Sequence, residues 1–190
     1  QVGRSARNEI SPRQGLIRMR EFTQMELEYF FNPKDQTFPK FGKIKREKLR
    51  FASGGEQPHS EEIGVLVSSG VIANEIMAYF LWKISQLYQS YGIPKDCFAF
   101  RKMPKEETPH YSKGNIDLEV ETSYGLVETV GVAYRTDFDL SQHSKHSGAD
   151  LSVFVEEEKA KVVPHVVEPS MGVDRLFWCV LEHSFREKSK

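Results

Sequence analysis

Apolar and polar residues alternate between residues 17 and 29, and alternation is the period of a β-strand. The apolar members occupy odd-numbered positions: Ile17, Met19, Met25, Leu27 and Tyr29. Arg18, Phe22 and Glu26 are also spaced by four, which would place them on one face of a helix. We favour strands, because the segment 11–15 reads SPRQG and has the composition of a loop. The sequence therefore predicts a long antiparallel hairpin.

The middle of the chain divides into a polar part and a helical part. Residues 32–55 are polar and weakly periodic, so we expect a surface excursion there. Within it, residues 40–50 hold six basic residues and one acid. A solvated surface is the commoner origin of such a run, and an RNA contact is the alternative. Residues 61–91 carry apolar side chains at helical spacing and predict one long core helix, or two.

The second half of the chain predicts more strands and a final helix. The alternating segments 116–122 and 126–135 flank Ser-Tyr-Gly and predict an antiparallel pair. Residues 141–148 are rich in Ser and His, so we expect a loop. The last segment reads as a strand at 162–168, a turn at 169–172 and a helix at 173–183. Hairpins with separate helices indicate an α+β fold, an antiparallel β-sheet flanked by helices.

Composition narrows the possible environments and partners. The 190 residues suffice for one domain with a real core, and 26 basic against 27 acidic residues give a net charge of −1. No global field would attract nucleic acid, so such a contact must be local. Cys97 and Cys179 lie far apart, which is typical of a reduced, cytoplasmic protein. No apolar stretch is as long as a membrane span, so we expect no membrane partner.

The predicted hairpin is unusually charged for a buried element. Arg7 and Glu9 would share a face of its first strand, and the second strand would present Arg18, Arg20, Phe22, Gln24 and Glu26. Charges on a sheet face lose hydration unless they meet partners. They could pair with one another in a structural network. Alternatively, the arginine forks could bind phosphate oxygens while Phe22 stacks on a base, which would make a nucleotide site.

Three blocks of sequence resemble one enzyme family. RNEISPRQGLIRMREFTQMELEYF, residues 7–30, resembles motif two of the glycyl-tRNA synthetases, which are class II aminoacyl-tRNA synthetases. VVPHVVEPSMGVDR, residues 162–175, is similar to motif three of that family. Between them, residues 110–144 resemble the central strands of the family, including its Y-G-x-x-E-x-x-G stretch. The order of the blocks is that of the family, so the resemblance implies the class II catalytic fold.

The resemblance implies an ATP site. Arg7 would hold the α-phosphate, with Glu9 beside it, and Arg18 would reach the outer phosphates. Phe22 would stack under the adenine, while Arg175 would cover its other face and touch the γ-phosphate. Arg7 and Arg175 are therefore the expected catalytic residues, because phosphoryl chemistry depends on positioning and charge compensation.

The resemblance also implies a glycine site and a metal. Glu26, Glu168 and Ser170 would hold glycine, with the carboxylates facing its ammonium group. Glu128 would help to hold Mg²⁺ or the nucleotide. Glycine offers no side chain to recognise, so selection would come from gripping the ammonium group and leaving no room at Cα.

The implied function is activation of glycine by ATP to glycyl adenylate, followed by transfer to the 3′ end of tRNA(Gly). The partners would be the acceptor end of that tRNA and, in the full-length family, a second copy in a homodimer. Residues 1–190 would form a single catalytic-core domain, in which residues 32–105 are a polar excursion and a helical insertion. Motif one and the anticodon-binding domain of the family fall outside this sequence. The alternative is a synthetase-like binding module with impaired catalysis.

Overall fold

The computed structural model describes residues 1–103 and 113–187. The strands are β1 (Val2–Ala6), β2 (Glu21–Glu26), β3 (Tyr29–Phe31), β4 (Lys48–Ser53), β5 (His59–Glu62), β6 (Phe98–Lys102), β7 (Asn115–Thr122), β8 (Gly125–Thr136), β9 (Val153–Val155), β10 (Ala160–Val162) and β11 (His165–Gly172). The helices are α1 (Phe41–Ile44), α2 (Ile63–Ser68), α3 (Glu75–Ser90), α4 (Phe138–Ser147) and α5 (Val173–Ser184), with short 3₁₀ turns η1 (Gly15–Ile17) and η2 (Lys95–Cys97).

One large sheet organises the described part of the chain. Its strands lie in the order β1-β2-β11-β8-β7-β6-β4-β5, and β3 pairs with β11 beside β2. The pairs are antiparallel except β4 with β6, and β9 with β10 forms a separate ribbon. A mostly antiparallel sheet with helices packed against it confirms the predicted α+β class.

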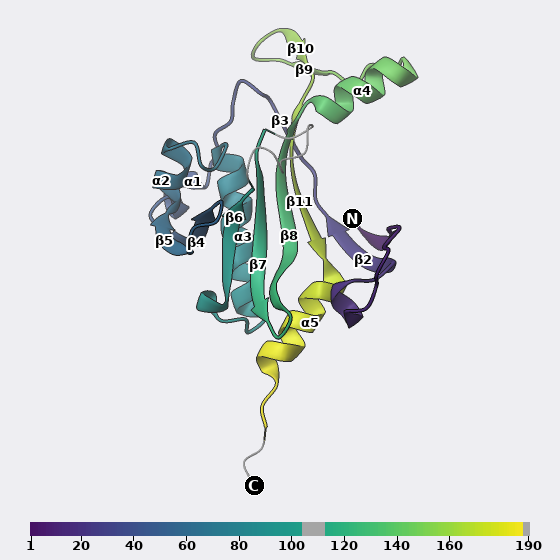
Figure 1. Cartoon of the computed structure of the whole chain (residues 1–190). Coiled ribbons are helices and arrows are strands. Elements are labelled where there is room, and N and C mark those ends of the chain that lie inside the picture. The colour runs from purple at the N-terminus through teal and green to yellow at the C-terminus, as the bar shows by residue number, and fades with distance from the viewer. Residues whose placement is uncertain (104–112, 188–190) are drawn as a thin grey trace.

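Helix α3 covers one face of this sheet and makes the core (Figure 1). Its first turn is capped by Asn74, whose Oδ1 accepts a hydrogen bond from the Met77 backbone N–H at 2.8 Å. The apolar side of the helix meets alternate residues of the central strands, all of them buried: Ile76, Leu81 and Tyr88 from α3, Ile116 and Leu118 from β7, and Val130 and Val132 from β8. Side chains at the intervening strand positions therefore point to the opposite, open face.

The predicted hairpin forms, but its connection is longer than expected. β1 and β2 pair antiparallel, with Val2 opposite Met25 and Ala6 opposite Glu21. Residues 7–20 connect them, so the expectation that Arg7, Glu9, Arg18 and Arg20 lie on strand faces is wrong. Gly15, with φ at +52°, starts a 3₁₀ turn that buries Ile17, and this turn interrupts the alternation.

The segment 32–62 differs from the expected surface excursion. Strand β4 lies inside the large sheet, and Leu49, Phe51 and Ala52 are buried. The basic run conceals the strand, because Lys48 and Arg50 alternate with those apolar residues. Residues 59–62 form β5 where the helical pattern was expected to begin. Two helices, α2 and α3, then follow, so the two-helix alternative is correct.

The second half of the chain confirms the central hairpin and the final helix and corrects two other expectations. Helix α4 replaces the loop expected at 141–148, and Gly148 ends it in the left-handed conformation. No turn occurs at 169–172, because β11 continues through Pro169 to Gly172. Pro169 has no N–H to donate, but its carbonyl accepts a hydrogen bond from the Leu27 N–H at 3.0 Å. Residues 110–112 of the central block lie outside the described residues.

Both cysteines are free thiols, and Cys179 is buried. Among the helices that the structure describes, none has the length and apolar character needed to cross a membrane.

Candidate active site

The open face of the sheet carries a cavity of about 440 Å³. Strands β2, β7, β8 and β11, the connection 7–20 and the start of α5 supply its walls. All nine residues to which the sequence analysis assigned a role line this cavity: Arg7, Glu9, Arg18, Phe22, Glu26, Glu128, Glu168, Ser170 and Arg175. The structure thus brings together residues from both ends of the chain, while their individual roles stay predictions.

Strand register explains why the residues from different strands meet. Asp117 lies opposite Gly131, Gly131 opposite Ser170, and Ser170 opposite Glu26, so one row crosses β7, β8, β11 and β2. A second row, two residues along, contains Asn115, Ala133 and Glu168. Residues two apart on a strand share a face, and both rows therefore open into the cavity.

At one end of the cavity the groups come from the hairpin connection. The Arg7 guanidinium lies 5.6 Å from the centroid of the Phe22 ring, which is a cation–π distance. The Arg18 Nε is 3.8 Å from the Glu9 carboxylate, and the Arg20 Nε donates to the Glu9 carbonyl at 3.1 Å. The charged residues of this segment do pair with one another, as one reading of the sequence suggested, and Glu9 pairs with Arg18.

Arg175 closes this end from the other side. Its Nε donates to the Ile17 carbonyl at 2.9 Å, and its Nη1 donates to the Glu128 carbonyl at 2.6 Å. The same Nη1 is 3.9 Å from the Glu128 carboxylate. The preceding residue of the helix is fixed to β2, because the Asp174 carboxylate accepts the Thr23 N–H at 2.5 Å. Helix α5 therefore holds a second guanidinium at the cavity that Arg7 also lines.

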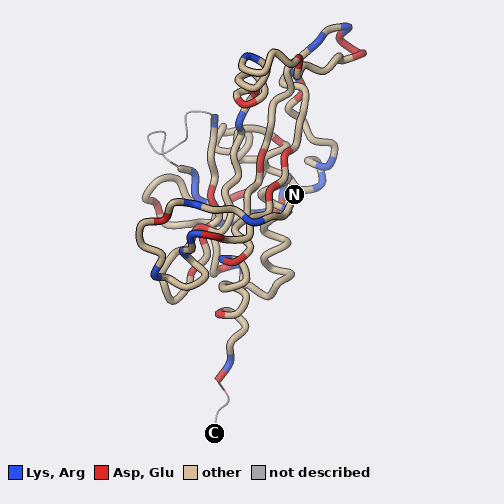
Figure 2. The backbone as a smooth tube through the Cα atoms, turned by 90° about the vertical axis from the view of Figure 1, so that its right-hand side faces the viewer, with Lys and Arg blue, Asp and Glu red and all other residues tan. Residues whose placement is uncertain are grey.

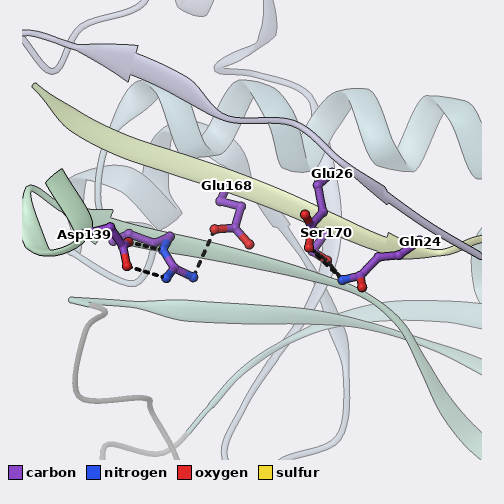
Figure 3. A network of polar contacts seen from close by, with 6 residues as sticks. Gln24, Glu26, Asp139, Glu168 and Ser170 are labelled. Carbon is purple, nitrogen blue, oxygen red and sulfur yellow. Dashed lines mark hydrogen bonds and ion pairs between the residues drawn. The ribbon is translucent and has the colours of Figure 1, made fainter. Parts of the chain in front are cut away.

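The other end of the cavity is a network of carboxylates and amides (Figure 3). The Gln24 Nε2 donates to the Ser170 hydroxyl at 2.6 Å and to Glu26 Oε1 at 2.8 Å. The Glu168 carboxylate is 3.0 Å from the Arg135 guanidinium. Burial raises the pKa of Glu168, while the charge of Arg135 lowers it. Figure 3 shows Glu26, Glu168 and Ser170 on neighbouring strands, β2 and β11, and all three line the cavity.

Arg135 is itself held by a second acid. Its guanidinium makes two hydrogen bonds to Asp139, at 2.6 and 2.9 Å. Asp139 is in the first turn of α4, the helix that replaced the expected loop. Arg135 had no predicted role, although its position four residues after Gly131 in β8 puts both on one face.

Asp117 is the second cavity residue without a predicted role. It is 7% exposed, and its Oδ1 accepts a hydrogen bond from the Asn115 amide at 2.8 Å. Burial, together with the nearby Glu128 carboxylate, raises the pKa of Asp117 to about 7. Polar residues at 115, 117 and 119 alternate with apolar ones, and that pattern was a readable signal of a polar face.

The electrostatic character of the cavity is mixed. Figure 2 shows acidic positions recurring along the strands of the sheet. Across residues 1–103 and 113–187, no group of three or more His, Cys, Asp and Glu side chains is arranged to hold a metal ion by itself. Mg²⁺ usually binds through one or two carboxylates together with substrate phosphates, and the half-exposed Glu128 carboxylate fits that requirement.

Comparison with solved structures identifies the fold. A prolyl-tRNA synthetase of Giardia lamblia, solved with prolyl-adenylate, superposes with a TM-score of 0.60 at 13% identity, covering 96% of this chain and 28% of that one. A prolyl-tRNA synthetase from Cryptosporidium parvum, complexed with L-proline and AMP, gives the same TM-score at 12% identity over 96% of this chain and 30% of that one. The chain has the catalytic fold of the class II aminoacyl-tRNA synthetases.

Sequence comparison gives the particular family. Glycine–tRNA ligase of Pyrococcus abyssi is 46% identical over 171 residues, which is 86% of this chain and 30% of that protein. The Archaeoglobus fulgidus ligase is 34% identical over 255 residues, 97% of this chain and 45% of that protein. The resemblance to glycyl-tRNA synthetases is therefore confirmed, and the chain spans 30% and 45% of the length of these two relatives. No protein-family model matches the chain.

Proposed function

We propose that this chain is the catalytic core that activates glycine with ATP to glycyl adenylate, for transfer to the 3′ end of tRNA(Gly). One observation carries the proposal. Arg7 and Arg175, from opposite ends of the sequence, line the same cavity as Glu26, Glu168 and Ser170. A phosphate-binding end and an ammonium-binding end thus share one cavity, as an aminoacyl-adenylate would require.

The first chemical step needs no nucleophile from the protein. The glycine carboxylate attacks the α-phosphorus in line, the bond to the β-phosphate oxygen breaks, and pyrophosphate leaves. Arg7 compensates the charge that develops on the α-phosphate, while Arg18 and Arg175 hold the outer phosphates. Phe22 and Arg175 enclose the adenine. Mg²⁺ bound to the phosphates and Glu128 would supply further charge neutralisation.

Glycine would be recognised by its ammonium group. Glu26 and Glu168 supply negative charge, and Ser170 supplies a hydroxyl between them. The Gln24 amide already orients Glu26 and Ser170, and Arg135 orients Glu168. A larger amino acid would place its side chain against these fixed groups, and steric overlap discriminates strongly where a cavity cannot expand.

The wider setting follows from the resemblance. The proposed partners are the acceptor end of tRNA(Gly) and, in the full-length family, a second copy in a homodimer. Free cysteines agree with the proposed cytoplasmic location. We keep 1–190 as a single catalytic-core domain, now with β4 to β6 and α1 to α3 integrated in it.

Glycine-dependent exchange of labelled pyrophosphate into ATP tests the proposal directly. The chain should catalyse exchange, and Arg7→Ala should reduce it by at least about 100-fold because one charge-compensating group is lost. Arg13→Ala is the matched control, since Arg13 is an exposed residue of the same connection that does not line the cavity. ATP binding without any exchange would favour the binding-module alternative, and equal exchange by the Arg7→Ala and Arg13→Ala variants would remove Arg7 from the site.

A further inference from the structure

The central strand pair contains an irregularity next to the cavity. Leu118 lies opposite Val130, whereas the next residue, Glu119, lies opposite Glu128. Thr129 is therefore an extra residue in β8, which is the definition of a β-bulge. Bulges reverse the alternation of a strand, because the residues before and after them differ by one position in phase.

This reversal determines where Glu128 points. After the bulge, the even-numbered residues Val130 and Val132 are buried in the core, while Gly131 lines the cavity. Before the bulge the odd-numbered Val127 is buried, and Glu128 lines the cavity. In a regular strand Glu128 would have the phase of Val130 and would face the core. The bulge is therefore what gives the cavity its Glu128 carboxylate.

The bulge also serves Arg175. An unpaired ladder position leaves backbone groups available for other partners. The Glu128 carbonyl accepts the Arg175 Nη1 at 2.6 Å, and the same guanidinium is 3.9 Å from the Glu128 carboxylate. The position of one bulge thus fixes two side chains that the proposed function places on the nucleotide.

A buried hydrogen-bond chain holds the bulge from the opposite face of the sheet. Tyr88 is in the last two turns of α3 and is 0% exposed. Its hydroxyl donates to the Thr129 hydroxyl at 2.8 Å, and the Thr129 hydroxyl donates to the Leu118 carbonyl at 3.3 Å. Burial raises the pKa of Tyr88, so the phenol stays a neutral donor. These two hydrogen bonds therefore connect β7 and β8, at the position of the bulge, to helix α3 behind them.

We propose that Tyr88 is a positioning residue for nucleotide binding, which acts through the Thr129 bulge on Glu128 and Arg175. The inference rests on the proposed role of those two residues at ATP. It assigns helix α3, which does not line the cavity, a part in nucleotide affinity. The alternative is that the Tyr88–Thr129 pair only stabilises the core. In that case its loss would lower the stability of the fold without a selective effect on nucleotide binding.

The first test needs no nucleotide. In Tyr88→Phe, amide hydrogen exchange should become faster at residues 118–119 and 128–130, because the bulge loses its anchor. Tyr91→Phe is the matched control, since Tyr91 is a half-exposed tyrosine one turn further along the same helix end. Unchanged exchange at the bulge in Tyr88→Phe would overturn the inference, whether or not the chain binds ATP.

The second test measures binding of Mg²⁺–ATP by calorimetry. Tyr88→Phe should weaken binding roughly 3- to 10-fold and leave the glycine concentration for half-maximal pyrophosphate exchange unchanged. A purely structural pair would lower the unfolding temperature without this selective effect. Thr129→Ser keeps the hydroxyl and should bind like the parent chain, whereas Thr129→Val should resemble Tyr88→Phe.

A double-mutant cycle assigns the route. If Tyr88 acts through Glu128, then Tyr88→Phe should add little to the weakened binding of Glu128→Gln. Fully additive losses would overturn this route. If the parent chain itself fails to bind Mg²⁺–ATP, the proposed function fails. Amide hydrogen exchange at residues 118–119 and 128–130 still decides whether Tyr88 anchors the bulge.

Discussion

The two ends of the cavity are built in different ways. At the amino-acid end, the groups project from paired strands and already make short contacts of 2.6 to 3.0 Å with one another. At the nucleotide end Arg175 is held by hydrogen bonds of 2.9 and 2.6 Å, but the guanidinium groups of Arg7 and Arg18, in the hairpin connection, make only longer contacts of 5.6 and 3.8 Å. The Arg18 side chain is 49% exposed, against 20% for Arg135 and 15% for Glu168. The amino-acid end is therefore preorganised, whereas the Arg7 and Arg18 side chains of the nucleotide end can adjust to their ligand.

This difference has a physical reason. Glycine is small and must be discriminated by fixed groups, because a site that yields would admit a larger amino acid. ATP is large and highly charged, so flexible arginine side chains can move to its phosphates and form strong charge-assisted hydrogen bonds after the nucleotide has entered. The amino-acid end should therefore respond sharply to loss of a supporting residue, and the nucleotide end should respond to ionic conditions.

Arg135→Met should have the largest effect at the amino-acid end. The variant leaves Glu168 buried without its countercharge, which raises the Glu168 pKa further and removes the negative charge that the ammonium group needs. We expect the glycine concentration for half-maximal exchange to rise at least about 10-fold, with a loss of about 3 kcal/mol in unfolding free energy. Urea unfolding and the exchange assay measure the two effects.

Arg4→Met is the control for that variant. Arg4 is an exposed arginine of β1 that is 3.7 Å from the exposed Glu21, and such pairs contribute little to stability. Equal glycine dependence in the two variants would mean that Arg135 does not support the ammonium site.

Asp117→Asn should change how stability depends on pH. The folded pKa of Asp117 is raised to about 7, so the folded state binds a proton that the unfolded state releases near pH 4. The stability of the parent chain should accordingly fall as pH rises from about 4 to about 7, by about 3 kcal/mol from this group. The asparagine variant should lose less over the same range, as measured by urea unfolding.

Glu121→Gln is a suitable comparison for Asp117→Asn. Glu121 is an exposed acid of the same strand that does not line the cavity, so this variant controls for the loss of a carboxylate from β7. Identical pH profiles for the parent chain and Asp117→Asn would show that Asp117 does not titrate in this range.

Added salt should have the smallest and most selective effect. Raising the ionic strength from about 0.05 to about 0.3 M screens exposed charges much more than buried ones. ATP affinity should fall several-fold because Arg7 and Arg18 are accessible, while glycine affinity at saturating ATP should change by less than about twofold. Calorimetry at both salt concentrations provides the comparison. Equal weakening of both ligands would erase the distinction between the two ends.

The residues that line the cavity were easier to predict from the sequence than the secondary structure between the motifs. The resemblance of the motifs to one family assigned Arg7, Phe22, Glu168 and Arg175 to a single site, and all four residues line the cavity. Local alternation could not reveal the buried strand β4, because charged residues on its exposed face dominate the composition of that segment. Pairing with β5 and β6 makes this segment a strand in spite of its basic composition.

Supporting residues were the hardest to foresee. Arg135 and Asp117 act through neighbours on adjacent strands, and only the strand register shows which neighbours those are. The phase change at Thr129 was equally hidden, because a bulge adds one residue without leaving a distinctive sequence. A simple period-2 reading of β8 would have sent Glu128 into the core.

The place of β11 in the sheet has a consequence for how the protein is made. It is the last strand in the described chain, yet it alone joins β2 and β3 to β8. While the polypeptide leaves the ribosome, β1 and β2 can form a hairpin but have no other sheet neighbour. The cavity cannot exist until residues 165–172 emerge and insert between the earlier strands. Substrate binding can therefore begin only after nearly all of the 190 residues have been synthesised.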